Sequence, residues 1–66
     1  MQYIIVGWHG GTPERTPFRS IEVAASVAGS LFEVGYYRRV FVYEVIPCET
    51  GSKVECLFEI PHKETN

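Results

Sequence analysis

A single segment of this chain, residues 21–34, has the periodicity of an amphipathic helix. Its apolar residues recur at steps of three and four, which predicts one stripe facing a sheet. Ser20 is a good N-cap, and Gly35 suits the left-handed conformation that ends many helices. Because one helix covers only one face of a sheet, this segment limits the fold to one helix layer on one sheet.

Three other segments are typical of β-strands, because they are rich in β-branched and aromatic residues or alternate apolar with polar ones. They span about residues 3–8, 39–46 and 53–60. Residues 9–18 hold two glycines and two prolines and predict a loop. In the last strand, one face is expected to carry the alternating residues Val54, Cys56, Phe58 and Ile60.

The predicted fold class is α+β: a single small βαββ domain over residues 1–60, followed by a polar C-terminal tail over 61–66. A strand, helix, strand unit predicts that segments 3–8 and 39–46 are parallel, while a hairpin makes 53–60 antiparallel. The expected sheet is three-stranded and mixed, with the helix on one face. Segment 53–60 could lie centrally or at the edge, and its polar face favours the edge.

The strand at 39–46 is apolar on both faces and therefore needs cover on both. The helix covers one face, so the other requires either a second copy of the chain or residues 9–18 folded under the sheet. We favour a homodimer. It would form through the valine side of the helix or the second face of the sheet, and its candidate interface residues are Val23, Val27, Val34, Phe41 and Tyr43.

Composition narrows the classes of partner. A 66-residue chain forms one domain that buries only about 60% of its unfolded surface, so its core is marginal. A formal net charge of −2 supplies no basic field, and nucleic acid is not an expected partner. No apolar run reaches the ~20 residues of a membrane span, and no signal-peptide pattern is present at the N-terminus. Two cysteines fit a reducing compartment, and we expect a cytoplasmic protein.

The sequence contains only weak signals for a metal site or for catalytic residues. His9, Cys48, Cys56 and His62 match a Cys₂His₂ zinc set in number, but zinc sites pair cysteines two to four residues apart. His9 with the following two glycines resembles an oxyanion loop, yet no G-x-S-x-G nucleophile motif accompanies it. We expect no metal, cofactor or catalytic residue, and no enzymatic activity.

Aromatic and arginine side chains, which dominate the energetics of protein interfaces, cluster next to the predicted strands. In a parallel arrangement, residues 9–18 and the junction at 36–39 lie at opposite ends of the sheet and form two patches. The candidate partner-binding residues are Trp8, His9, Arg15, Arg19, Tyr36, Arg38 and Arg39.

One spaced pattern runs through the chain from about residue 3 to residue 46, and it includes Phe18, Ser20, Ala24, Ala25, Ala28, Leu31, Gly35, Tyr36, Val40, Val42 and Tyr43. This pattern resembles one found in small phage and bacterial accessory proteins with a βαββ layout. The resemblance implies a compact counter-defence inhibitor of the anti-CRISPR type, which occupies the surface of a host protein in the host cytoplasm. It implies no catalytic residues.

The leading hypothesis is a non-enzymatic protein-binding module that is itself a homodimer. One alternative is a binder of small nucleotides or anions, which would use glycine N–H groups with Arg15 and Arg19. A second alternative is a weak binder of single-stranded nucleic acid through Tyr36, Arg38 and Arg39.

Overall fold

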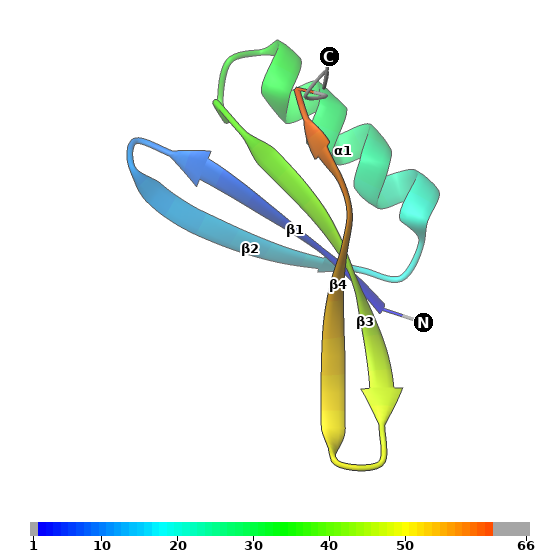
Figure 1. Cartoon of the computed structure of the whole chain (residues 1–66). Coiled ribbons are helices and arrows are strands. Elements are labelled where there is room, and N and C mark those ends of the chain that lie inside the picture. Colours follow the sequence, from blue (N-terminus) through cyan, green and yellow to red (C-terminus); the bar gives the residue numbers. More distant parts are fainter. Residues whose placement is uncertain (1, 62–66) are drawn as a thin grey trace, which may run out of the picture.

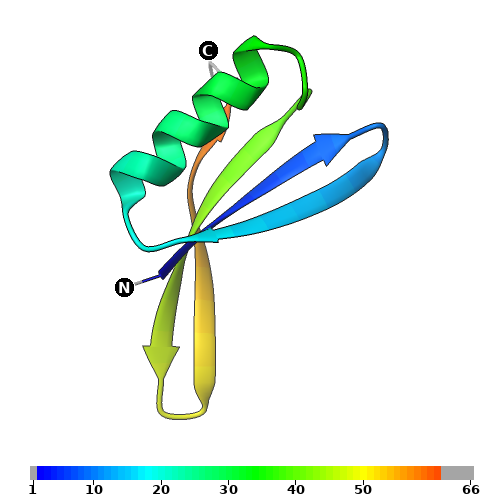
Figure 2. The same cartoon turned by 180° about the vertical axis from the view of Figure 1, so that it is seen from behind.

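The computed structural model describes residues 2–61, which form one four-stranded sheet with one helix packed on it, as Figure 1 and Figure 2 show from opposite sides. All neighbouring strands are antiparallel, in the order β2-β1-β3-β4. The predicted three-stranded mixed βαββ sheet is therefore wrong. Of the predicted tail, residues 62–66 lie outside the described residues. The elements are β1 (Gln2–His9), β2 (Thr12–Phe18), α1 (Ile21–Glu33), β3 (Val40–Cys48) and β4 (Gly51–Ile60).

The additional strand is β2, which occupies most of the predicted loop. Gly10 and Gly11 both have positive φ, 58° and 84°, as the tightest hairpin turns require, so β1 folds directly back into β2. Pro13 lies opposite Trp8, and Pro17 lies opposite Ile4. Because the two prolines are four residues apart, their nitrogen atoms face the same side of β2, which is the free edge of an outermost strand. The prolines are thus compatible with the strand.

The β1–β2 hairpin changes the direction of every later strand. It reverses the chain before α1, so β1 and β3 pair antiparallel, with Ile5 opposite Val42. The helix instead connects β2 to β3, which run in the same direction on either side of β1. The alternative in which residues 9–18 fold under the sheet is also wrong, since these residues extend the sheet sideways.

Both ends of α1 have the predicted caps. The hydroxyl of Ser20 accepts a hydrogen bond from the backbone N–H of Val23 at 3.4 Å. At the other end Gly35 has a φ of 81°, and the N–H of Tyr36 donates to the carbonyl of Leu31 at 3.0 Å, which closes a Schellman motif. No helix within residues 2–61 is long and apolar enough to cross a membrane.

The core lies between α1 and one face of the central strands. Ala24 and Ala28 are fully buried, and their small side chains let the helix approach the sheet closely. Larger side chains, among them Phe18, Leu31 and Phe58, surround this core and are partly buried. The fully or nearly fully buried apolar residues of the described chain are Ile5, Ala24, Ala28, Tyr37, Val40 and Val42.

Strand β4 contains a bulge at Leu57. Val42 pairs with Phe58, but its neighbour Tyr43 pairs with Cys56, so Leu57 has no opposite residue. The extra residue reverses the alternation of side chains along β4. The prediction of one continuous apolar face is therefore wrong: Phe58 and Ile60 pack against the core, whereas Val54 and Cys56 lie on the other side. The strand itself lies at the sheet edge.

Candidate functional site

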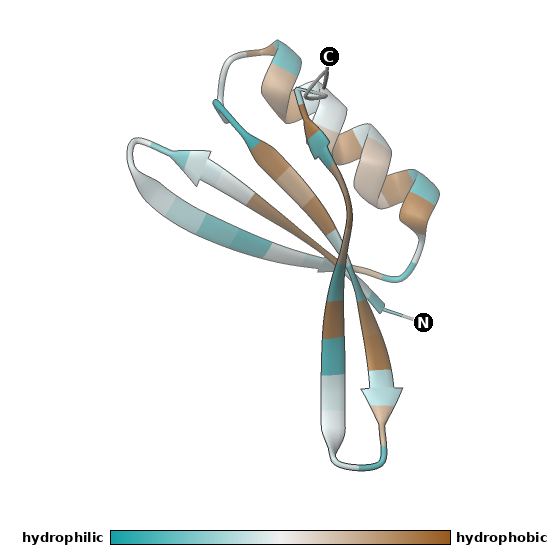
Figure 3. Ribbon diagram, in the orientation of Figure 1, coloured by the Kyte–Doolittle hydropathy of each residue, from teal (hydrophilic) through white to brown (hydrophobic). Residues whose placement is uncertain are grey.

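The face of the sheet that points away from α1 is rich in apolar side chains. Ile5, Val40 and Val42 are buried beneath the helix, and because strand side chains alternate, their neighbours in sequence lie on the opposite face. We call this surface the open face, and Figure 3 shows the hydrophobic segments of β1, β3 and β4 that contribute to it. Its residues include Ile4, Val6, Trp8, Arg15, Pro17, Arg39, Phe41, Tyr43, Val45, Val54, Cys56 and Glu59.

Several of these side chains are well exposed. The exposed fraction is 41% for Trp8 and 55% for Val54, and Leu57, at the bulge in β4, is 40% exposed. The rings of Phe41 and Tyr43 lie next to each other on β3, with centroids 6.3 Å apart. A group of large exposed apolar side chains on one rigid surface is unusual for a monomeric protein and marks an interaction site.

The open face is hollowed near its centre. A cavity of about 340 Å³ lies there, and side chains from all four strands line it: Ile4, Val6, Arg15, Tyr43 and Val54. Its walls are thus mostly aliphatic or aromatic, with one guanidinium group at the β2 side. Such a cavity fits an apolar or aromatic side chain of a partner better than a highly charged ligand.

A second cluster, on the helix side of the β1–β2 hairpin, consists of His9, Glu14, Tyr36 and Tyr37; we call it the tyrosine cluster. The rings of His9 and Tyr36 stack with centroids 4.0 Å apart, and Nδ1 of His9 donates to the carbonyl oxygen of Tyr36 at 2.8 Å. The hydroxyl groups of Tyr36 and Tyr37 both donate to the carboxylate of Glu14, at 3.2 and 2.9 Å. These contacts hold the segment after α1, which contains Tyr36 and Tyr37, against the β1–β2 hairpin.

The acid–base state of this cluster follows from its contacts. Burial, followed by the hydrogen bond to Glu14 and its negative charge, raises the pKa of Tyr37 to about 12. The same causes, in the same order, raise the pKa of Tyr36. Both phenols therefore keep their protons at neutral pH. This favours a structural role as hydrogen-bond donors over a role as base or nucleophile.

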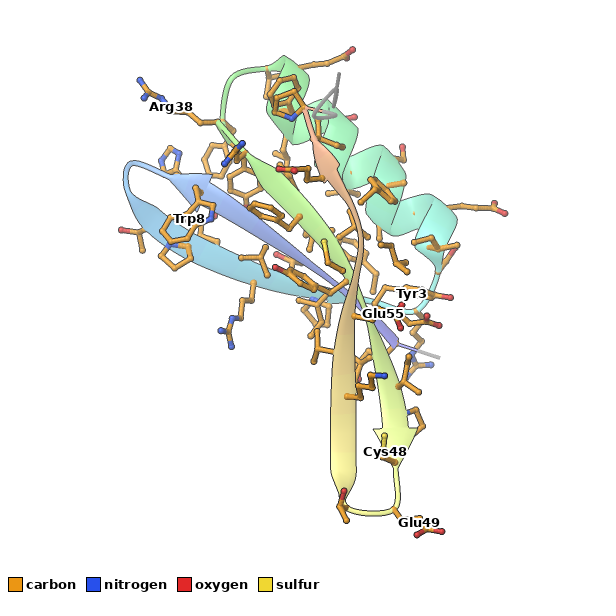
Figure 4. The ribbon with its side chains drawn as sticks, in the orientation of Figure 1. Tyr3, Trp8, Arg38, Cys48, Glu49 and Glu55 are labelled. Carbon is orange, nitrogen blue, oxygen red and sulfur yellow. The ribbon has the colours of Figure 1, made fainter. Side chains whose placement is uncertain are left out.

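The structure brings together residues that the sequence assigned to two patches. The N–H of Trp8 donates to the carbonyl of Arg39 at 3.0 Å, and the N–H of Arg38 donates to the carbonyl of Trp8 at 3.2 Å. The separation of these residues was wrongly predicted, because antiparallel β1 and β3 place the end of one beside the start of the other. Figure 4 shows Trp8 and Arg38 near this common end, and both are exposed.

The other predicted partner-binding residues are distributed as follows. Arg15 and Arg39 lie on the open face, where Nη2 of Arg39 is 3.8 Å from Oε2 of Glu59. His9 and Tyr36 belong to the tyrosine cluster. Arg19 follows β2 at the far end of the sheet, beside a hollow that Gln2, Pro17 and Phe18 also line.

The candidate dimer residues fall on two separate surfaces. Phe41 and Tyr43 lie on the open face. Val23 on α1 and Val34 at its C-cap are 51% and 77% exposed in the other layer of the molecule, and Val27 packs against the core. One contiguous interface therefore cannot contain the whole set.

The residues weighed for metal binding do not meet within the described part of the chain. Cys56 lies on the open face, and Cys48 lies opposite Gly51 at the tip of the β3–β4 hairpin, which Figure 4 shows apart from the helix. Both cysteines are free thiols. Between residues 2 and 61, no three His, Cys, Asp or Glu side chains are grouped as a metal site requires; His62 lies outside this range.

The sites predicted from the sequence did not include several residues of these surfaces, among them Ile4, Val6 and Glu14. The alternation of Ile4 and Val6 with the buried Ile5 was available as a signal for the open face. Glu14 had no such signal, because it fell in the predicted loop.

No protein-family model, curated protein or solved structure matches this chain.

Proposed function

We propose that this chain is a non-enzymatic protein-binding module and that the open face is its binding surface. The observation that carries this proposal is a largely apolar cavity in the open face, lined in part by Tyr43 and the exposed Val54, on a surface that also presents the exposed Trp8. Aromatic and arginine residues contribute most of the binding energy in protein interfaces. A surface built on strands is ordered before binding, so little conformational entropy is lost on association.

The structure supports a protein partner over the two alternatives. A nucleotide-binding loop would need free glycine N–H groups close to Arg15 and Arg19, but Gly10 and Gly11 form the hairpin turn and Arg19 follows the opposite end of β2. The nucleic-acid alternative relied on Tyr36, Arg38 and Arg39, but the Tyr36 ring is stacked on His9 and Arg39 is 3.8 Å from Glu59. The open face itself is mostly apolar, and apolar surface is buried most favourably against another apolar surface.

The proposal extends to a biological role and a compartment. The counter-defence role implied by the sequence resemblance is one form of protein binding, in which the module blocks the surface it covers. The two free thiols support action in a reducing compartment such as the cytoplasm.

Photo-cross-linking tests the proposal directly. A photoreactive residue is placed at Val54 on the open face and, as a matched control, at Val34, the C-cap of α1; both valines are exposed. The two purified variants are irradiated in a cell lysate. We expect discrete protein adducts at position 54 that are absent at position 34. Equal labelling at both positions, or none at either, would contradict binding through the open face.

A further inference from the structure

The order of charges across the open face suggests which partner fits it. Arg15, Val6, Phe41 and Glu59 are laterally paired and form one row across all four strands. The row thus has a positive charge on β2, two apolar side chains on the central strands, and a negative charge on β4. If a second copy of this row is reversed and laid over the first, each charge lies opposite a charge of the other sign.

A two-fold axis produces that reverse. If the axis lies between two facing sheets, parallel to the strands and between β1 and β3, it places β2 of one copy over β4 of the other. Arg15 of each copy then faces Glu59 of the other, and Val6 faces Phe41. An axis perpendicular to the strands along this row would instead place Arg15 over Arg15, which is repulsive. The charge pattern selects the first arrangement.

The neighbouring row is compatible with the same axis. It consists of Pro17, Ile4, Tyr43 and Cys56, so the axis places the Tyr43 ring of one copy over Ile4 of the other. Ile4 and Val6 line the cavity of the open face, and the aromatic rings of the second copy would project toward it. Sheets packed face to face at about 10 Å, with strands within about 30°, interdigitate their side chains in this way.

The small core gives a reason for such an assembly. Six apolar side chains of the described chain are buried, and three of these, Ile5, Val40 and Val42, belong to the central strands. Domains of this size commonly gain stability from oligomerisation. Covering the opposite face of the same strands would bury β1 and β3 on both sides.

We propose that the open face binds a second copy of this chain across a two-fold axis parallel to the strands, with reciprocal Arg15–Glu59 pairs at its rim. The inference rests on the proposed function and names the partner of the same surface. The charges that identify this arrangement are Arg15 and Glu59, because no other orientation of the face places the two opposite each other. The Glu59 carboxylate, which is 3.8 Å from Arg39 of its own chain, would then lie between two guanidinium groups.

Two single variants and their mixture test the arrangement. Arg15→Glu alone places like charges over Glu59 in both halves of the dimer, and Glu59→Arg alone does the same over Arg15. Each variant is expected to weaken self-association by about tenfold or more, since juxtaposed like charges are costly at an interface. An equimolar mixture restores two opposite-charge pairs in the heterodimer. We therefore expect the mixture, and neither variant alone, to sediment as a dimer at concentrations where the wild-type chain does.

The outcomes separate this inference from the proposed function. Circular dichroism and thermal unfolding check that both variants fold, which is expected because the Arg39–Glu59 pair that Glu59→Arg breaks is partly exposed. A wild-type chain that stays monomeric at high micromolar concentration, or a mixture that does not recover, overturns the dimer. A monomeric chain that binds a single-stranded oligonucleotide also overturns it. The cross-links at Val54 would still test protein binding in either case.

Discussion

The ring of Tyr37 lies directly against Gly7, in the space that any other residue at position 7 would fill with its side chain. A Cβ atom added to Gly7 would overlap the ring, and Tyr37 is almost fully buried, so the ring has little room to move. This contact joins β1 to the segment that follows α1. It also positions the Tyr37 hydroxyl for its hydrogen bond to Glu14.

The first prediction concerns this contact. Gly7→Ala is expected to lower the free energy of unfolding by about 1–3 kcal/mol, because it overpacks the core against Tyr37. Gly29→Ala is the matched control, since Gly29 lies within α1 and a Cβ there meets no atom within 4 Å. The control should raise the free energy of unfolding by roughly 0.5–1 kcal/mol. Urea denaturation measures both, and equal effects of the two substitutions would contradict the packing described.

The second prediction concerns the turn between β1 and β2. Gly10→Val is expected to destabilise the fold by roughly 1–2 kcal/mol, because a β-branched residue is strained at a φ of 58°. Gly10→Asn should be close to neutral, since asparagine tolerates this conformation and is common in such turns. Thermal unfolding of the two variants distinguishes them. If both were equally stable, residues 9–18 would not form a tight hairpin.

The third prediction concerns pH. The pKa of Tyr37 is raised from the ordinary value of 10.0 to about 12, so the folded chain holds this proton more tightly than the unfolded chain. The associated stability is complete below a pH of about 10 and is lost as the pH rises toward 12. Glu14→Gln should lower the pKa of Tyr37 but leave it above 10.0, because the negative charge is removed while burial, the larger cause, remains. Ultraviolet titration of tyrosinate absorbance measures the shift, with Tyr37→Phe assigning the transition. An unchanged titration in Glu14→Gln would argue against an influence of the Glu14 charge on Tyr37.

The fourth prediction concerns two like charges on β3 and β4. Glu44 and Glu55 are directly paired across the strands, an arrangement that is unfavourable for carboxylates. Glu55→Lys is expected to stabilise the fold by about 0.2–1 kcal/mol. Glu49→Lys makes the same change in net charge at the hairpin tip and serves as the control (Figure 4). Salt should reduce the difference between the two variants, and a control that stabilises equally would assign the effect to net charge alone.

The parts of the fold that were predictable are those encoded locally. Ser20 and Gly35 mark the ends of α1 because a cap depends on one side chain or one φ angle close in sequence. The strand β2 was mispredicted because its two prolines and the two preceding glycines together indicated a loop, whereas the glycines form only the hairpin turn. Prolines are excluded from a paired strand edge but not from a free one, and which edge is free depends on the whole sheet.

The open face and the tyrosine cluster depend more than the helix caps do on pairing between residues far apart in the sequence. The bulge at Leu57 moves Val54 and Cys56 onto the open face, and a strict alternation in the sequence gives no sign of it. The tyrosine cluster joins Glu14 to Tyr37 across the antiparallel pairing of β1 with β3, which the predicted parallel arrangement excluded. In both cases the error in strand direction or register carried over into the predicted surface.

Competition between the two cysteines for a thiol reagent tests the central claim, that the open face is covered by a second copy. Cys56 lies on the open face and Cys48 at the hairpin tip; both are exposed in the single chain, so each molecule contains its own control. Alkylation rates are measured by mass spectrometry from low to high protein concentration. If the open face binds a second copy, Cys56 becomes progressively protected while Cys48 reacts at an unchanged rate. Reaction of Cys56 at the same rate relative to Cys48 over the whole concentration range would contradict it.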